Sequence, residues 1–328
     1  MKKSNVIVSY KKILIIIIIL GSFFIMTLLK INFSIEIKNK VFMEKSKFFD
    51  KNFDYLHYEN DIITEKMKKN ANWILAESHI YLINGLIRKY KPKNCLEIGV
   101  ARGGSSILIL NAIKDYPDSQ LISIDLFTNR GKNKIGYLVE RHFPELMNKW
   151  KLFLGEMPHR FLTKLNIKFD FLFLDSAHMS PGEFFNFIEA LPFLNENAIV
   201  VIHDIVWHYL KAMIPNQTLY DAKVMPTQIY LMSSLMGEKI IMKRGSKGLD
   251  NIGVVCLSSN QKNYYLNYFL LIMTIWQYMP TEKQLNDLRE FISNYYKNKF
   301  FLKIFDYSVY YNKKFFYNLK TRKYINAI

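Results

Sequence analysis

Cysteine is scarce in this sequence, with two residues among 328. Both, Cys95 and Cys256, lie inside apolar runs of strand character, where a thiol behaves as a small core side chain. The sequence therefore implies neither a disulfide framework nor a thiolate metal site. The sequence also contains no internal repeat and no low-complexity linker, so we expect one substantial core with terminal additions.

Acidic residues are also few. The 28 Asp and Glu residues are outnumbered by 45 Lys and Arg, which gives a formal net charge of +17. Such an excess would suit an anionic partner such as nucleic acid or a membrane surface. Lys, Asn, Ile, Tyr and Phe are abundant together, however, which is typical of an AT-rich genome. We therefore interpret the charge as compositional and do not expect a nucleic-acid partner.

One run of the chain carries no charge over a length that approaches a membrane span. This run is residues 13–29, ILIIIIILGSFFIMTLL. Its length is near the lower end of the roughly 17 to 25 residues that a helix needs to cross a bilayer. The run is long for the apolar part of a cleaved signal peptide, and no small-residue cleavage motif follows it. We therefore predict a transmembrane helix at 13–29 after a tail at 1–12. Lysines flank the run on both sides, so the positive-inside rule leaves its orientation open.

After this run we expect a helical lead-in, an α/β domain and a helical extension. The lead-in, residues 30–90, includes apolar residues at helical spacing. Residues 91–258 alternate Val-, Ile-, Leu- and Phe-rich strands with helices, the pattern that a parallel sheet covered on both faces requires. Residues 259–328 are rich in aromatics and lysines, which predicts an extension packed on the sheet domain. The same composition would also suit stacking on sugars or nucleobases, or a membrane interface.

The fold class that follows is α/β, doubly wound. Strands are predicted at 94–99, 120–127, 150–155, 169–176 and 198–205, with helices at 104–115, 136–148, 158–165 and 181–194. After a helix-rich stretch to residue 236, two short strands around a Gly-containing turn indicate a closing antiparallel hairpin.

Polar residues stand at the carboxyl ends of all five predicted parallel strands. They are Glu97, Asp125, Glu156, Asp175, and His203 with Asp204. Ligands of open α/β sheets bind outside these ends, where the strand order reverses. Strand ends are also where polar residues must reach the surface, but five in register favour a single rim of functional groups.

The turn after the first strand, CLEIGVARGGSS, has glycines at 99, 103 and 104 and an acid at 97. A dinucleotide site uses such glycines to bring backbone N–H groups to a pyrophosphate, which a neighbouring carboxylate would repel. A cofactor without phosphate and with cationic groups suits this turn instead. S-adenosylmethionine, an adenosine joined to a sulfonium and an α-amino acid, is such a cofactor. Asp125, 26 residues beyond Gly99, would then accept its ribose hydroxyls.

At these residues the sequence resembles the class I S-adenosylmethionine-dependent methyltransferases, in particular the group of sugar and antibiotic O-methyltransferases and cephalosporin hydroxylase-like proteins. The segments that carry the resemblance are CLEIGVARGGSS, LISIDLF, FDFLFLDSAHMSPGEFFNFIEALPFLNENAIVVIHDI and the final hairpin. The resemblance implies a Rossmann-like seven-stranded sheet of order 3-2-1-4-5-7-6 with the last strand antiparallel, and a methyltransferase domain at 91–258. It assigns these residues to the cofactor: Glu97, Gly99, Gly103, Ser105, Asp125 and Glu156. Ser105 could equally cap the following helix, and Arg102 either holds the cofactor carboxylate or is exposed.

Methyl transfer to an alcohol benefits from a base or a metal that activates the hydroxyl. Asp175 and Asp204 end adjacent strands, so their carboxylates could converge on Mg²⁺ or another divalent cation, which prefers oxygen ligands. His178, three residues after Asp175, and His203 are the possible bases, and His178 as general base is the competing arrangement. Because His203 precedes Asp204 in a strand, their side chains should point to opposite sides, and we place Asp204 in the site. In metal-dependent relatives an Asn or Asp follows the second acid, whereas here Ile205 does. We therefore predict Asp175, His178 and Asp204 as the catalytic residues, and Asp175 with Asp204 as the metal ligands.

The sequence thus predicts a single-pass membrane methyltransferase that acts on a hydroxyl of a small molecule or a saccharide. A cytosolic cofactor supply favours a cytoplasmic catalytic domain. A hydroxylase-like relative with the same fold and a noncatalytic S-adenosylmethionine-binding module are the alternatives. The acceptor, the oligomeric state and the role of the extension are not determined by the sequence.

Overall fold

The computed structural model describes residues 49, 54–56, 66, 75–206, 226–243 and 249–321. The chain divides into two units, Met1–Asp50 and Lys51–Ile328. Every helix and strand described below belongs to the second unit. The predicted tail, the predicted span at 13–29 and most of the predicted lead-in lie outside the described residues.

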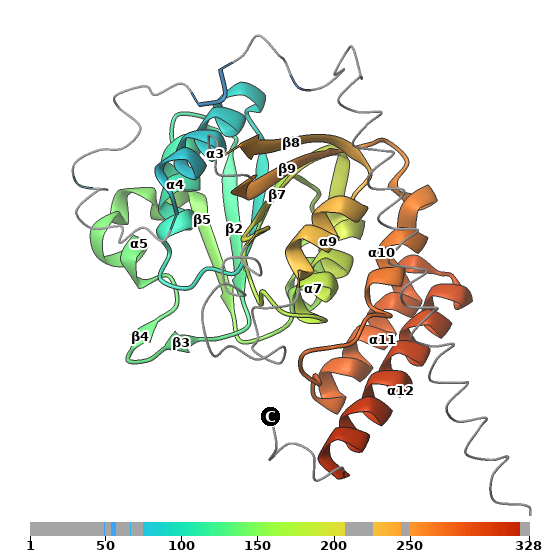
Figure 1. Ribbon diagram of the computed structural model, residues 1–328. Coiled ribbons are helices and arrows are strands. Elements are labelled where there is room, and N and C mark those ends of the chain that lie inside the picture. The colour runs from blue at the N-terminus through green and yellow to red at the C-terminus, as the bar shows by residue number, and fades with distance from the viewer. Residues whose placement is uncertain are drawn as a thin grey trace, which may run out of the picture. The chain divides into compact units, whose positions relative to one another are not determined.

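A seven-stranded sheet forms the centre of the second unit (Figure 1). Its strands in chain order are β1 Asn94–Ile98, β2 Gln120–Asp125, β5 Trp150–Leu154, β6 Phe169–Leu174, β7 Leu194–His203, β8 Gly237–Lys243 and β9 Leu249–Leu257. Their spatial order is β5-β2-β1-β6-β7-β9-β8, and β9 pairs antiparallel with both β7 and β8. This is the predicted order 3-2-1-4-5-7-6 with the predicted antiparallel last strand.

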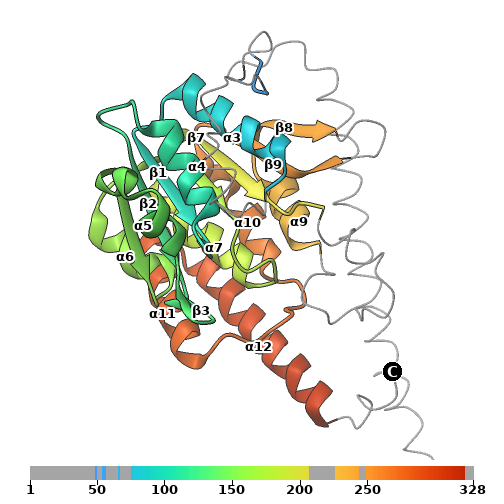
Figure 2. The ribbon, with the colours of Figure 1, turned by 90° about the vertical axis from the view of Figure 1, so that its left-hand side faces the viewer.

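Helices cover both faces of this sheet, as a parallel sheet with apolar strands requires. The helices of the sheet domain are α3 Glu77–Tyr90, α4 Gly104–Ile113, α5 Tyr137–His142, α6 Pro158–Leu165, α7 Gly182–Ala190 and α9 Thr227–Ser234, with the 3₁₀ turns η1 Pro144–Lys149 and η2 Leu191–Phe193. Helices α3, α4 and α5 lie on one face, and α7 and α9 lie on the other (Figures 1 and 2). The doubly wound α/β prediction is therefore confirmed.

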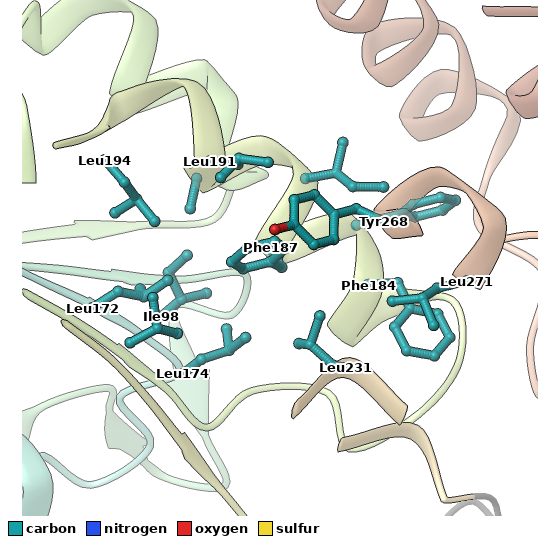
Figure 3. Packing of buried hydrophobic residues seen from close by; sticks show 14 of the residues in the cluster. Ile98, Leu172, Leu174, Phe184, Phe187, Leu191, Leu194, Leu231, Tyr268 and Leu271 are labelled. Carbon is teal, nitrogen blue, oxygen red and sulfur yellow. The ribbon is translucent and has the colours of Figure 1, made fainter. Parts of the chain in front are cut away.

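The alternation of side chains along β1 decides which residues join which layer. Leu96 and Ile98 point into the main apolar cluster beneath α6, α7 and α9, whereas Glu97 between them points to the α4 layer. In the cluster, Tyr268 packs edge-to-face on Phe187 with ring centroids 5.3 Å apart (Figure 3).

The C-terminal extension consists of helices, as predicted. It comprises the 3₁₀ turn η4 Gln261–Tyr264 and the helices α10 Tyr265–Leu271, α11 Glu282–Tyr296 and α12 Lys299–Thr321. The side chain of Trp276 is fully buried against Phe185 of α7, with ring centroids 5.4 Å apart. The aromatic residues of the extension therefore continue the core of the sheet domain.

The predicted transmembrane helix has to be corrected in the fold class. Among the described helices, none is both long enough and apolar enough to cross a membrane. The longest of them, α12, carries Lys299, Lys303, Asp306 and further lysines along its length. The span predicted at 13–29 lies outside the described residues, and the fold class is accordingly a seven-stranded α/β sheet with a helical extension and no established span.

A second difference is a two-stranded hairpin that the sequence patterns did not predict. Strands β3 Asn129–Arg130 and β4 Asn133–Lys134 pair antiparallel between β2 and α5. Both strands are exposed and carry no alternating apolar pattern, so periodicity could not reveal them.

Candidate active site

A cavity of about 810 Å³ opens at the carboxyl ends of the parallel strands. Its lining includes Gly99 after β1, Asp125 at the end of β2, Asp175 after β6 and Asp204 after β7. Strand β1 separates β2 from β6 and β7 in the sheet order, so Asp125 lies on one side of β1 and the other two acids lie on the opposite side. The predicted rim of strand-end residues thus surrounds one cavity. Two of the predicted residues, Glu97 and Glu156, do not line it.

Gly99 lies where β1 passes directly against the loop after β6. Its φ is +93°, a conformation that favours glycine, and a Cβ here would overlap the carbonyl oxygen of Asp175. The absence of a side chain therefore brings the two loops together beneath the cavity. Gly103, with φ +95°, caps α4 and packs on Gly136 and Val139. It does not line the cavity, so the turn needs this glycine for packing.

Glu97, the acid of the opening motif, is fully buried and does not line the cavity. Its carboxylate accepts hydrogen bonds from Ser105 Oγ at 2.5 Å, Ser106 Oγ at 2.6 Å and Ser123 Oγ at 2.5 Å. Burial raises the pKa of Glu97 to about 7, although the three hydroxyls oppose that rise. The residue ties β1 to β2 and to the first turn of α4, so it supports the site from below.

Asp125 lines the cavity, and part of its carboxylate organises the turn after β1. Its Oδ2 accepts the backbone N–H groups of Val100 at 3.0 Å and Ala101 at 3.1 Å, and Oδ1 accepts that of Phe127 at 2.9 Å. A carboxylate has about four acceptor positions, so one remains for a ligand hydroxyl.

Three further predicted or considered cofactor residues lie outside the cavity lining. Ser105 donates to Glu97 and holds no helix-capping hydrogen bond. Glu156 has a 45% exposed side chain that lies 3.7 Å from Lys283, while its neighbours Met157 and Pro158 line the cavity. Arg102 is exposed.

The predicted catalytic residues do come together. Nε2 of His178 lies 3.5 Å from Asp175 Oδ1 and 3.5 Å from Asp204 Oδ2. One ligand atom from each of the three residues lies within 4.8 Å of the others, so the group could hold a metal ion. The loop that carries His178 is fixed by Glu183, whose buried carboxylate accepts the His178 backbone N–H at 3.0 Å and Ser176 Oγ at 2.9 Å.

His203 lies beneath these carboxylates, although the strand alternation predicted that it would point away from Asp204. Its Nδ1 is 3.3 Å from Asp175 Oδ2 and 3.4 Å from Asp204 Oδ1. The chain leaves the strand at Asp204, whose φ of +60° turns its side chain to the same side. Burial alone would lower the pKa of His203, but the carboxylates, Asp175 foremost, raise it to about 9. Burial would likewise raise the pKa of Asp175, and His203 holds that pKa below its ordinary value instead.

The sequence patterns missed several cavity residues from outside the central strands. His79 of α3 and Asp250 of β9 line the cavity and bond to each other. Asn251 donates from Nδ2 to Asp204 Oδ1 at 2.5 Å. Tyr278 of the extension lines the cavity beside Gly182. No spacing rule connects residues so distant in the chain. Only their polar side chains could have suggested that they belong to the site.

The sheet order and the strand-end site define a methyltransferase-like α/β fold, and comparison with known proteins agrees. Residues 96–205 match the model of a family described as a methyltransferase domain. This match confirms the predicted resemblance to methyltransferases and the predicted enzyme class. No curated protein matches the chain.

Solved structures give a more distant likeness. The O-methyltransferase TomG from Streptomyces achromogenes, involved in tomaymycin synthesis and solved with S-adenosylmethionine, is 19% identical with a TM-score of 0.46; the match covers 69% of this chain and 96% of TomG. An O-methyltransferase from Bacillus cereus, solved with S-adenosylhomocysteine, is 19% identical with a TM-score of 0.45 and coverages of 61% and 93%.

Proposed function

We propose that this chain is an S-adenosylmethionine-dependent methyltransferase that transfers a methyl group to a hydroxyl oxygen of a small molecule. The observation that carries the proposal is the single cavity that holds Gly99 and Asp125 on one side of β1 and the Asp175, His178 and Asp204 cluster on the other. Its volume lies within the roughly 300 to 1,000 Å³ typical of ligand sites. One side suits the nucleoside and the other suits the acceptor.

The cofactor side is built from the ends of β1 and β2. Asp125 keeps an acceptor position for a ribose hydroxyl, because backbone N–H groups occupy only part of its carboxylate. Phe127, two residues further on, lines the cavity with a 66% exposed ring. An exposed aromatic ring beside a ribose-binding acid suits stacking with adenine. Gly99 allows the ligand to approach the backbone closely.

The acceptor side would align a hydroxyl with the sulfonium methyl group for in-line displacement. His178 Nε2 lies within reach of this position and takes the hydroxyl proton as the C–O bond forms. The C–S bond breaks at the same time, and sulfur leaves as a neutral thioether. The carboxylates of Asp175 and Asp204, each 3.5 Å from Nε2, would stabilise the positive charge that the ring gains with the proton.

The same three residues fit a divalent cation. Two ligands on a four-coordinate ion with bonds of 2.0 to 2.1 Å lie about 3.4 Å apart, close to the 3.5 Å between His178 Nε2 and each carboxylate oxygen. Asp175, Asp204 and His178 would hold the ion, and a mixed oxygen and nitrogen donor set suits Mn²⁺ or Zn²⁺ as well as Mg²⁺. A bound ion would act as a Lewis acid that lowers the pKa of the acceptor hydroxyl.

The C-terminal extension supplies part of the acceptor side. Gln277 donates its backbone N–H to the Ser180 carbonyl at 2.8 Å, and its side-chain Oε1 accepts the Ser180 N–H at 2.9 Å. These bonds attach the extension to the loop that carries His178 and place the next residue, Tyr278, in the cavity lining. We propose that Tyr278 contacts the acceptor.

Calorimetric titration of the full chain with S-adenosylmethionine tests the cofactor, with NAD as the competing ligand. We expect binding of the former and none of the latter, and the opposite result contradicts the proposal. Turnover is tested by S-adenosylhomocysteine formation in the presence of catechol, phenol, glucose and a sugar nucleotide. Binding without turnover on any hydroxyl acceptor would favour the noncatalytic alternative.

The metal is tested separately by titration with EDTA. Loss of turnover that Mg²⁺ or Mn²⁺ restores would assign a cation to Asp175, His178 and Asp204. Turnover that EDTA leaves unchanged would assign the proton transfer to His178 alone.

We also propose that the catalytic domain lies on the cytoplasmic side of the membrane, because the cofactor is supplied there.

A further inference from the structure

A chain of buried side chains runs from β9 to the proposed catalytic carboxylates. Asp250 Oδ1 lies 2.9 Å from His79 Nε2, and His79 Nδ1 lies 3.2 Å from His203 Nε2. The other ring nitrogen of His203 faces Asp175 and Asp204 at 3.3 and 3.4 Å. His79, Asp250 and His203 are all buried, with exposed fractions of 3%, 6% and 4%. The two imidazoles are thus in series between one carboxylate and a pair of carboxylates.

The hydrogen bonds in this chain fix which nitrogen carries each proton. The Asp250 carboxylate only accepts, and it already receives Ser78 Oγ at 2.9 Å and the Asn251 backbone N–H at 2.8 Å. His79 must therefore donate from Nε2. Burial lowers the pKa of His79, so the ring carries one proton and its Nδ1 is an acceptor. The donor to that acceptor is then the Nε2–H of His203.

We propose that His79 and Asp250 are positioning residues that fix the His203 ring, with its Nε2–H donated to His79 Nδ1 and its Nδ1 directed at the carboxylates of Asp175 and Asp204. The catalytic consequence rests on the proposed function, whereas the ring orientation follows from the geometry alone. A histidine without such a partner can rotate its ring. The relay removes this freedom beneath the residues proposed to activate the acceptor.

Neither positioning residue lies within the matched methyltransferase segment, residues 96–205. His79 is on α3, before that segment, and Asp250 is on β9, after it. The strand register brings Asp250 close, because His203 pairs with Ile252 of β9, two residues further along, and His79 of α3 contacts both His203 and Asp250. The site is therefore completed by the helix that precedes the domain and by the antiparallel strand that closes the sheet.

The relay is tested by long-range ¹H–¹⁵N spectra of the full chain labelled with ¹⁵N-histidine, assigned with His79→Asn and His203→Asn. We expect protonated Nε2 on both histidines of the relay and an unprotonated Nδ1 on His79. In His79→Phe the acceptor of the His203 Nε2–H is removed, so we expect the Nε2–H signal of His203 to shift or to be lost by exchange with water. Asp250→Ala removes the acceptor that keeps the His79 proton on Nε2, so the same signal should weaken there. Ser78→Ala is the matched control, since it removes another donor to Asp250 and leaves the relay in place. A His203 Nε2–H signal that is the same in His79→Phe as in the wild type would overturn the proposal.

A second readout separates positioning from structural support. Calorimetry with S-adenosylmethionine should give the same dissociation constant, within about twofold, for the wild type, His79→Asn and Ser78→Ala. With an acceptor that turns over, His79→Asn should lower kcat by about tenfold or more, as loss of a partner that orients a functional histidine does, while Ser78→Ala should not. Equal kcat values in the two variants would overturn the catalytic role. The spectra test the hydrogen bonds of the relay without any methyl acceptor, so failure of the proposed function remains distinguishable from failure of the relay.

Discussion

Replacement of Glu97 by Gln tests how the ionisation of a fully buried carboxyl group affects the stability of the domain. The carboxyl group is fully buried between β1, β2 and α4, and it accepts hydrogen bonds from three serine hydroxyls at 2.5 to 2.6 Å. Gln has nearly the same shape and keeps one acceptor oxygen, but it does not titrate. A pH-dependent difference in stability between the two proteins therefore isolates the ionisation of Glu97.

The size of this difference follows from the pKa of Glu97. Burial is the largest cause of its rise from 4.5 to about 7, and the three hydroxyls oppose it. The folded state thus holds the proton more tightly than the unfolded state. The resulting stability is fully present below pH 4.5 and is lost as the pH rises to about 7. Each pH unit in this interval is worth about 1.4 kcal/mol, so the loss is on the order of 3 kcal/mol.

The measurement is urea unfolding of the full chain and of Glu97→Gln at several pH values from 4.5 to 8.5. We expect the free energy of unfolding of the wild type to fall relative to the variant up to pH 7 and then to stay parallel. Glu156→Gln is the control, since it makes the same substitution at a side chain that is 45% exposed. A difference between wild type and Glu97→Gln that is independent of pH would refute the reasoning, because it would mean that the three hydroxyls keep the carboxylate ionised throughout.

Three further substitutions test the two sides of the cavity. Gly99→Ala places a Cβ against the carbonyl oxygen of Asp175 at a φ of +93°, so we expect a loss of about 2 kcal/mol or more in unfolding free energy and weaker S-adenosylmethionine binding by calorimetry. Asp175→Asn should lower kcat by about 100-fold or more and leave cofactor binding nearly unchanged; full turnover would exclude Asp175 from catalysis. Tyr278→Ala should raise the KM for the acceptor and not that for the cofactor, and a change in both would place Tyr278 elsewhere.

The strands were predictable because each is a near-continuous apolar run between turn signals. Helix α6 begins and ends where its pattern predicts, at Pro158 and Leu165. The predicted helix at 136–148 is instead α5 followed by η1, with the break at Phe143 and Pro144. Proline favours the first turn of a new helix, so Pro144 could have been used to predict the break.

The role of Glu97 could not be read from its position at a strand end. Alternation along β1 determines that Leu96 and Ile98 join one core and Glu97 the opposite layer. A residue that points into a layer of packed helices cannot also point into a cavity beyond the strand end. Its signal was the pair Ser105 and Ser106 eight and nine residues later, which offers two hydroxyls to one carboxylate.

The proposed catalytic cluster was predictable in part because Asp175, His178 and Asp204 all follow buried strands. Their partners were not, because His79 and Asp250 are 171 residues apart and each stands in an unremarkable pattern. His79 occupies the apolar face of α3 between buried residues, where a core histidine is the ordinary interpretation. Only the pairing of β7 with β9 brings Asp250 within reach of it.

The distribution of these residues has a consequence for specificity. The residues proposed to bind the cofactor, Gly99 and Asp125, lie inside the matched segment, whereas His79, Asp250 and Tyr278 come from elements before and after it. A change in the flanking elements can therefore reshape the acceptor side without touching the turn that receives the nucleoside. Exchange of the 274–284 segment, which carries Tyr278, should alter which hydroxyl is methylated while the affinity for S-adenosylmethionine stays the same.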